Sequence, residues 1–170
     1  RRTIGDLYAD NHYGRLAERA HRDGLKFSTE PYGGPFEFLQ IAGRADFPMV
    51  EFWTGPRNVL PTEQAAEKPR FHGVMGAHTS GKRIIGSEAF TAEEGWIMHP
   101  YAIKSLGDVM FASGINQFII HVCAHQPYLR EGVHPGFTSG INGIHFDRGN
   151  TWFDHGGKEW VDYLRRCQGV

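Results

Sequence analysis

Cysteine is scarce in this sequence: Cys123 and Cys167 are the two in 170 residues. Two thiols cannot build a disulfide framework or a zinc knuckle, so the fold must rest on its core. Excess charge is also missing, because 18 Lys and Arg stand against 19 Asp and Glu, for a formal net charge of −1. A near-neutral chain lacks the excess of positive charge by which proteins bind nucleic acid or an anionic membrane. We therefore expect neither as a partner.

Long apolar runs are absent as well. The longest reach four residues, against the roughly 20 that a membrane-spanning helix needs. The sequence is 40% hydrophobic and 22% charged, which is typical of a globular domain and excludes disorder as its main state. Its length suits one ordinary domain. No Gly-x-Gly-x-x-Gly follows a candidate strand, and Thr79–Lys82 lacks the preceding strand that a phosphate-binding loop needs.

Short apolar segments alternate with helical patterns along the chain. The segments lack clean polar alternation, which favours parallel strands covered on both faces. They predict strands over residues 25–30, 48–53, 83–88 and 117–123. Between and beside them, capping residues and apolar spacing predict helices over residues 3–21, 36–42, 69–81, 100–114 and 160–167.

The first of these helices should begin at a capping box formed by Thr3 and Asp6, with Leu7, Leu16 and Ala20 among its apolar positions. Strand–helix alternation predicts an α/β fold with a parallel sheet. A (β/α)8 barrel takes eight such units and roughly 250 residues. We therefore predict a partial (β/α)8 TIM-type barrel of about four units, with residues 1–170 forming a fragment of one catalytic barrel domain.

Three glutamates occupy comparable places at the ends of predicted strands: Glu30, Glu51 and Glu88. The fourth strand ends at His121, with His125 just beyond. Carboxyl ends of parallel strands face the active site of α/β proteins, so these side chains should converge. A single glutamate there is as readily a salt-bridged or capping group, but three in equivalent places favour a site.

Converging carboxylates suit glycoside hydrolysis, where one protonates the leaving oxygen and another activates water or attacks the sugar. The sequence is 13% aromatic, which supplies rings for stacking on sugars or for a core. The candidates for stacking on sugar faces are Tyr32, Trp53, Trp96, Tyr128 and Trp152. We expect Tyr32, Trp53 and Trp152 to bind substrate.

Long blocks of the sequence resemble glycoside hydrolase family 106, the α-L-rhamnosidases. They span the chain in order and cover residues 30–34, 43–53, 81–91, 99–108, 114–116, 125–127 and 143–152. Val50 departs from the pattern, since a smaller residue is expected before Glu-Phe-Trp. The resemblance implies a large enzyme with a (β/α)8 catalytic barrel and accessory β-domains outside this chain, inversion at the anomeric carbon, and an associated Ca²⁺.

On this resemblance we assign Glu88, Glu51 and Glu30 as the catalytic carboxylates, with Glu88 as general base. His121 and His125 should donate hydrogen bonds to sugar hydroxyls or orient a glutamate. Asp147 should contact a substrate hydroxyl or form an ion pair with Arg148 at the rim. The partner is a rhamnose-containing glycan or glycoside. A secreted or periplasmic location accords with the family. The isolated fragment should be inactive, because part of its acid–base machinery lies elsewhere.

Alternative functions remain open from the residues themselves. One is a retaining barrel glycosidase of other sugar specificity, whose two carboxyl groups would stand closer together. Another is a metal-dependent hydrolase using His121 and His125 with His145 or Asp147, since His pairs of this kind can bind zinc. A third is a non-catalytic carbohydrate-binding remnant.

Overall fold

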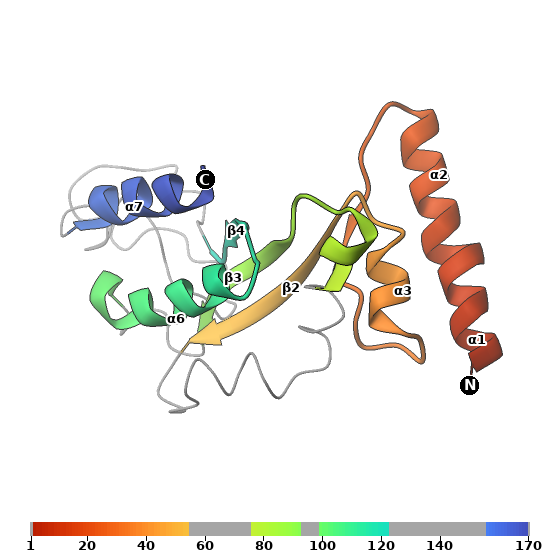
Figure 1. Cartoon of the computed structure of the whole chain (residues 1–170), viewed down its shortest axis with the longest axis horizontal. Helices are drawn as coiled ribbons and strands as arrows, with labels where there is room; N and C mark the ends of the chain where they lie inside the picture. Colours follow the sequence, from red (N-terminus) through yellow and green to blue (C-terminus); the bar gives the residue numbers. More distant parts are fainter. Residues whose placement is uncertain (1, 55–75, 93–98, 123–155, 170) are drawn as a thin grey trace, which may run out of the picture.

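The computed structural model describes residues 2–54, 76–92, 99–122 and 156–169. Four parallel strands form one sheet in chain order, β1-β2-β3-β4 (Figure 1). The strands are β1 Ser28–Thr29, β2 Phe47–Thr54, β3 Gly86–Ala92 and β4 Gln117–Ile120. The predicted α/β class and the parallel sheet are confirmed, and the described part neither closes into a barrel nor excludes one.

All four predicted strands exist, but their bounds differ from the prediction. β1 has only two residues, and β3 begins at Gly86 and runs on to Ala92. Glu51 and Glu88 consequently lie inside β2 and β3 rather than at their ends. The expectation of strand-end glutamates was therefore wrong for these two, and holds for Glu30 directly after β1.

The N-terminal helix is interrupted by a π-helical segment. It consists of α1 Arg2–Leu7, the π-helix η1 Tyr8–Gly14 and α2 Arg15–Arg22. Because a π-turn holds more residues than an α-turn, the buried face shifts along the helix. Gly5, Ala9 and Ala17 are its buried residues.

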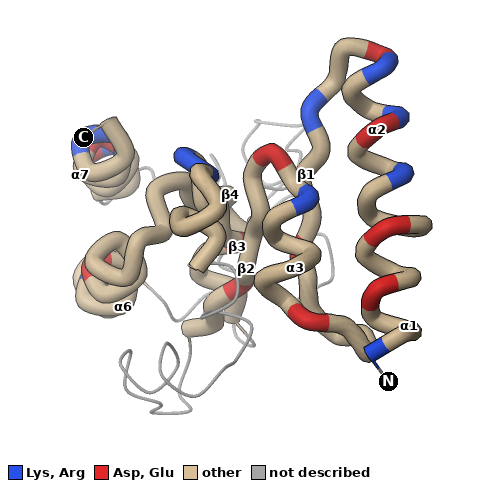
Figure 2. The backbone as a smooth tube through the Cα atoms, turned by 45° about the vertical axis from the view of Figure 1, so that its right-hand side comes forward, with Lys and Arg blue, Asp and Glu red and all other residues tan. Residues whose placement is uncertain are grey.

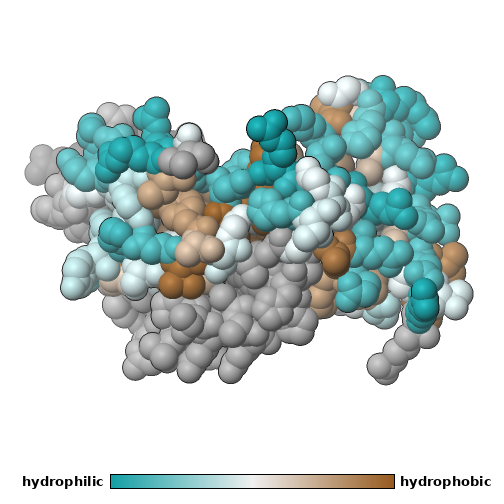
Figure 3. Space-filling view, viewed as in Figure 1, coloured by the Kyte–Doolittle hydropathy of each residue, from teal (hydrophilic) through white to brown (hydrophobic). Residues whose placement is uncertain are grey.

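Two expectations about this helix were wrong. Leu7 is 54% exposed and Leu16 45% exposed, so neither is a core position. Thr3 lies within α1, so it does not cap the helix from outside. The outer side of this helix carries charges of both signs along its length (Figure 2), and hydrophilic residues dominate its surface (Figure 3).

The other predicted helices match more closely. α3 covers Phe38–Ala42, and α6 covers Pro100–Ala112 with the proline in its first turn, as its sequence predicts. α7 covers Lys158–Gln168, with Trp160 and Leu164 buried. Of the predicted helix over 69–81, the 3₁₀-helix η2, Gly76–Ser80, is described and the rest lies outside the described residues. Among the described residues, no helix is long and apolar enough to cross a membrane.

The core lies on one face of the sheet, beneath α6 and α7. Side chains alternate along β2, so that Val50 and Phe52 are buried while Glu51 and Trp53 are only partly covered. Phe52 packs edge-to-face on Phe90 and Phe118, with ring centroids 4.9 and 5.3 Å apart. Ile103, Leu106 and Met110 of α6 and Trp160 and Leu164 of α7 complete this cluster. Glu51 and Trp53 lie on the opposite face of the sheet.

The Asp46 side chain connects the end of the N-terminal helix to the chain on either side of β1. The Asp46 carboxylate accepts a hydrogen bond from the backbone N–H of Phe27 at 2.7 Å and contacts His21 Nε2 at 2.8 Å. The Phe27 N–H bond, more than the contact with His21, holds the pKa of Asp46 below its ordinary value against the opposing effect of burial. An ionised Asp46 therefore fixes the chain between α2 and β2.

Candidate active site

Two glutamates face each other on neighbouring strands, on the side of the sheet away from the core. Glu51 of β2 and Glu88 of β3 are direct register partners. Both are partly exposed, whereas the residues that flank them, Val50, Phe52 and Ala89, are fully buried on the other side. Strand alternation therefore directs both carboxylates to one surface.

A third carboxylate reaches this surface from the loop after β1. Glu30 directly follows Thr29, which pairs with Pro48 at the start of β2. Its Oε2 accepts a hydrogen bond from the Tyr32 hydroxyl at 2.7 Å. Tyr32 thus orients Glu30, a predicted catalytic residue. The expected stacking of its ring on a sugar stays a prediction.

Carboxylate oxygens of Glu30, Glu51 and Glu88, one from each, all lie within 4.8 Å of one another. The predicted convergence of the three glutamates is therefore found in the structure. Like charges at this separation repel in a partly buried site unless a proton or a cation lies between them. Hard oxygen donors of this kind suit Ca²⁺, which takes six to eight oxygen ligands and accepts flexible geometry. The donor set fits a calcium ion.

Glu88 has a close hydroxyl partner on its own strand. Thr91 Oγ1 donates a hydrogen bond to Glu88 Oε1. These residues are three apart, which would place them on opposite faces of a regular strand. The register with β2 shifts between Glu51 and Trp53, and Phe90 has a φ of 64°. This irregularity, a β-bulge in β3, brings Thr91 to the side of Glu88.

His121 approaches the same carboxylate from the end of β4. Its Nδ1 lies 3.8 Å from Glu88 Oε1, with side chains 21% and 27% exposed. Within the described part of the chain, this buried Nδ1 has no hydrogen-bond partner. The backbone N–H of His121 donates to Ala89 O at 3.0 Å, which continues the ladder beyond β4. His121 therefore lies beside Glu88, as the sequence predicted, with a ring nitrogen directed toward the site.

The other predicted site residues divide into two groups. Trp53 is on β2, partly exposed, and is the register partner of Thr91. His125, Asp147 and Trp152 lie outside the described residues, as do Trp96, Tyr128 and His145. The structure thus brings together Glu30, Tyr32, Glu51, Glu88 and His121.

Thr91 is the site residue that sequence reasoning missed. It is the last residue of a block that resembles the family, which was the available signal. The predicted strand over residues 83–88 ended before it, and regular strand spacing would place it on the face opposite Glu88. A phenylalanine with positive φ is uncommon, so the sequence carried no sign of the bulge.

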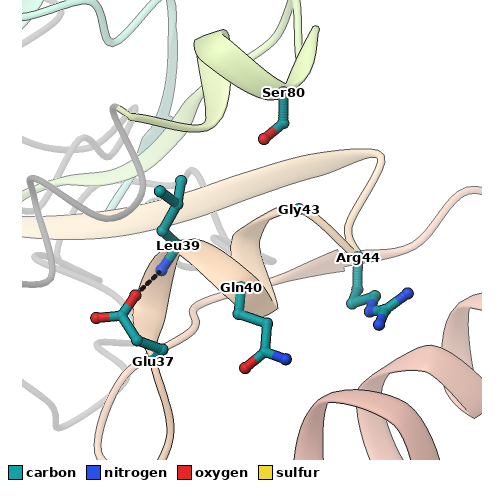
Figure 4. A pocket seen from close by; sticks show the side chains of 6 residues that line it. All are labelled: Glu37, Leu39, Gln40, Gly43, Arg44 and Ser80. Carbon is teal, nitrogen blue, oxygen red and sulfur yellow. Dashed lines mark hydrogen bonds between the residues drawn. The ribbon is translucent and has the colours of Figure 1, made fainter. Parts of the chain in front are cut away.

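A separate depression lies away from the glutamates, between α3 and η2 (Figure 4). It is shallow, with a volume of about 450 Å³. Its lining residues are Glu37, Leu39, Gln40, Gly43, Arg44 and Ser80. Glu37 caps α3 by accepting from the backbone N–H of Leu39 at 3.3 Å. This carboxylate is therefore engaged in a structural role, and the depression is not the site.

Comparison with known proteins agrees with this geometry. Residues 1–169 match glycoside hydrolase family 106, described as alpha-L-rhamnosidase. A Formosa agariphila protein, provisionally named a beta-glucuronidase, is 42% identical over 168 residues, which cover 99% of this chain and 14% of that protein. The solved structure of a rhamnosidase from Novosphingobium sp. PP1Y has a TM-score of 0.79 and 30% identity, over 98% of this chain and 16% of its own.

The chain thus spans less than a fifth of the length of either relative. The family match nevertheless covers all but its last residue. This chain belongs to glycoside hydrolase family 106, the α-L-rhamnosidase family.

Proposed function

We propose that this chain supplies the central carboxylates of an inverting α-L-rhamnosidase that removes terminal rhamnose from a glycan or glycoside. The observation that carries the proposal is the convergence of Glu30, Glu51 and Glu88 within 4.8 Å on one face of a parallel sheet. Membership of the family supports the sugar class.

We further propose that the sheet is part of a (β/α)8 barrel completed by other segments of a longer protein. Its strands are parallel and adjacent in chain order, without the reversal that marks a doubly wound sheet. Four strands are half of what a barrel requires. The small share of both relatives that the chain covers agrees with this division.

Glu88 is the proposed general base, held by Thr91 and flanked by His121. An inverting enzyme separates its acid and base carboxyls by roughly 6.5–9.5 Å, which leaves room for a water. Oxygens of Glu30 and Glu51 stand nearer to Glu88 than that. The proton donor of an inverting reaction is therefore expected outside this group, on another barrel strand.

Glu30 and Glu51 are then suited to hold Ca²⁺ beside Glu88. Their two carboxylates would supply negative ligands, with Tyr32 fixing the orientation of Glu30 through its 2.7 Å hydrogen bond. A calcium ion at this place would bind sugar hydroxyls and offset the mutual repulsion of the carboxylates. The chain's own contribution is to present the three side chains from a rigid sheet.

A second candidate substrate is a glucuronide, which the name of the Formosa relative suggests. Glucuronic acid carries a carboxylate, whereas rhamnose is uncharged. A cation held by Glu30, Glu51 and Glu88 would offset their repulsion of that carboxylate, so the charge of the cluster does not separate the two sugars. The match of residues 1–169 to the α-L-rhamnosidase family is what favours rhamnose.

The test uses the full-length protein with an aryl α-L-rhamnoside and an aryl β-D-glucuronide. We expect hydrolysis of the rhamnoside alone, and NMR of the first product should show the inverted anomer. Glu37→Gln is the matched control for Glu88→Gln, because Glu37 is an exposed helix cap. Hydrolysis of the glucuronide alone would overturn the sugar assignment, and retention of configuration would overturn the mechanism.

A further inference from the structure

β3 has one irregular point, and it lies directly beside Glu88. Between the partner pairs Glu51–Glu88 and Trp53–Thr91, β2 advances by two residues and β3 by three. The residue that absorbs the difference is Phe90, with a φ of 64°. Bulges of this kind re-aim side chains and are frequent next to active sites.

The bulge delivers one hydroxyl to one carboxylate oxygen. Without the extra residue, Thr91 would face the core while Glu88 faced the site. With it, Thr91 Oγ1 donates to Glu88 Oε1. Thr91 is only 2% exposed, so water has little access to replace this donor. A buried hydroxyl on a sheet is also more rigid than one on a loop.

The core holds the bulge in place from the other side. The Phe90 ring is fully buried and packs edge-to-face on Phe52, Phe118 and Trp160, with centroids 4.9, 5.5 and 5.6 Å away. A bulky residue rarely adopts positive φ unless its surroundings enforce it. The packing of this ring therefore fixes the position from which Thr91 reaches Glu88.

We propose that Thr91 is a positioning residue for Glu88. Its hydroxyl donates to Oε1 and so holds the carboxylate in one orientation. His121 Nδ1 lies 3.8 Å from the same oxygen, without a hydrogen bond to it. The consequence for the reaction rests on the proposed function of Glu88 as general base. Thr91 itself does not touch the sugar in this role.

The experiment compares three variants of the full-length protein. Thr91→Val removes the hydroxyl and keeps the side-chain shape, while Thr91→Ser keeps the hydroxyl. Ser87→Ala is the control, because Ser87 is a buried hydroxyl on the same strand that donates to backbone oxygens of Val50 and Glu88 at 3.1 and 2.8 Å. Should Thr91→Val fail to fold, Thr91→Ala removes the same hydroxyl from a smaller side chain.

On an aryl rhamnoside we expect Thr91→Val to lower kcat by about 10–100-fold, the usual cost of losing a group that orients a functional side chain. KM should change little and Thr91→Ser should restore most of kcat. Ser87→Ala should lower kcat much less than Thr91→Val, because the Ser87 hydroxyl contacts backbone oxygens and not the Glu88 carboxylate. Wild-type kcat in Thr91→Val, failure of Thr91→Ser to rescue, or an equal loss in Ser87→Ala would overturn the inference.

Crystal structures of the same variants separate this inference from the proposed function. If the parent cleaves no rhamnoside, the proposed function fails, and the structures alone decide the role of Thr91. A Glu88 side chain that moves in Thr91→Val or Thr91→Ala, and stays in Thr91→Ser, supports positioning. An unmoved Glu88 in every variant refutes it.

Discussion

Glu51 and Glu88 are direct partners across β2 and β3, so two carboxylates stand side by side on one rung of a parallel sheet. Like charges opposite each other destabilise a sheet. A cation bound between two such carboxylates would offset this repulsion. A pair of like-charged side chains therefore stands at the site proposed to act on sugar.

The first prediction concerns these carboxylates in the full-length protein. Glu88→Gln should lower kcat on an aryl rhamnoside by at least 10²–10⁴-fold, the contribution of a general base. In EGTA, where no calcium ion offsets the repulsion, it should also raise the thermal midpoint slightly, because one of two adjacent negative charges is removed. Steady-state kinetics and thermal melts measure both effects, with Glu37→Gln as the unaffected control. Unchanged kcat would exclude Glu88 as base.

The second prediction concerns metal removal. Chelation by EGTA should lower the thermal midpoint of the full-length protein, because a ligand that binds only the folded state stabilises it. Added Ca²⁺ should restore the midpoint. The double variant Glu30→Gln, Glu51→Gln should respond to neither treatment. A midpoint that ignores EGTA in the parent protein would contradict calcium binding at this cluster.

The third prediction concerns the close approach of α6 to the core. A Cβ atom at Gly107 would lie 3.2 Å from Phe90 Cζ and 3.6 Å from Phe118 Cε2. Since the Phe90 ring is enclosed, Gly107→Ala should destabilise the protein by about 1–3 kcal/mol despite the better helix propensity of alanine. Chemical denaturation of the full-length protein measures this.

Gly43→Ala is the matched control for that substitution. Its φ is −63°, and a Cβ there meets only ordinary contacts at 3.4 and 3.5 Å. Its effect should stay below about 0.5 kcal/mol. Equal effects of the two alanines would show that α6 can move away from Phe90.

The fourth prediction concerns the contact between α6 and α7. Tyr163 donates its hydroxyl to Asp108, which also accepts from Lys104 at 2.5 Å. Burial first, and then the bond to Asp108, raise the pKa of Tyr163 from its ordinary value near 10 to about 12. Because the folded state keeps this proton longer than the unfolded state, the stabilisation is complete below pH 10 and is lost as pH rises toward 12.

Tyr163→Phe should therefore melt below the parent at pH 8, and the gap should close as pH approaches 12. Thermal melts of the full-length protein across this range measure the gap. Tyr101→Phe is the control, since Tyr101 is 89% exposed. A gap that stays constant with pH would rule out linkage through Tyr163.

The fifth prediction concerns the chain in isolation. β1 and β4 are the outer strands of the described sheet, each paired on one side. Unpaired strand edges promote association, so the isolated chain should aggregate or melt without cooperativity, and it should not hydrolyse rhamnosides. Size-exclusion chromatography and a melt test this. A monomer with a cooperative melt above about 45 °C and measurable turnover would contradict it.

Strand order, parallel pairing and the meeting of three glutamates could be predicted from sequence, because apolar runs and the carboxyl ends of parallel strands follow general rules. Two local irregularities of the backbone could not be predicted. A bulge at Phe90 reverses the side on which Thr91 lies. Leu7 and Leu16 are exposed on a helix that contains a π-segment from Tyr8 to Gly14. The bulge and the π-segment have no signature in residue spacing.

The order of strands in the sheet also bears on how the chain can be assembled during synthesis. Each strand pairs with the one made just before it, so no strand must wait for a distant partner. Pairing between consecutive strands closes shorter loops than pairing with a more distant strand would, so its entropy cost is smaller. On the ribosome, the sheet can therefore grow from β1 toward β4 as each unit emerges. β4 is the last strand to pair, so Glu51 and Glu88 are already side by side on β2 and β3 when it is added.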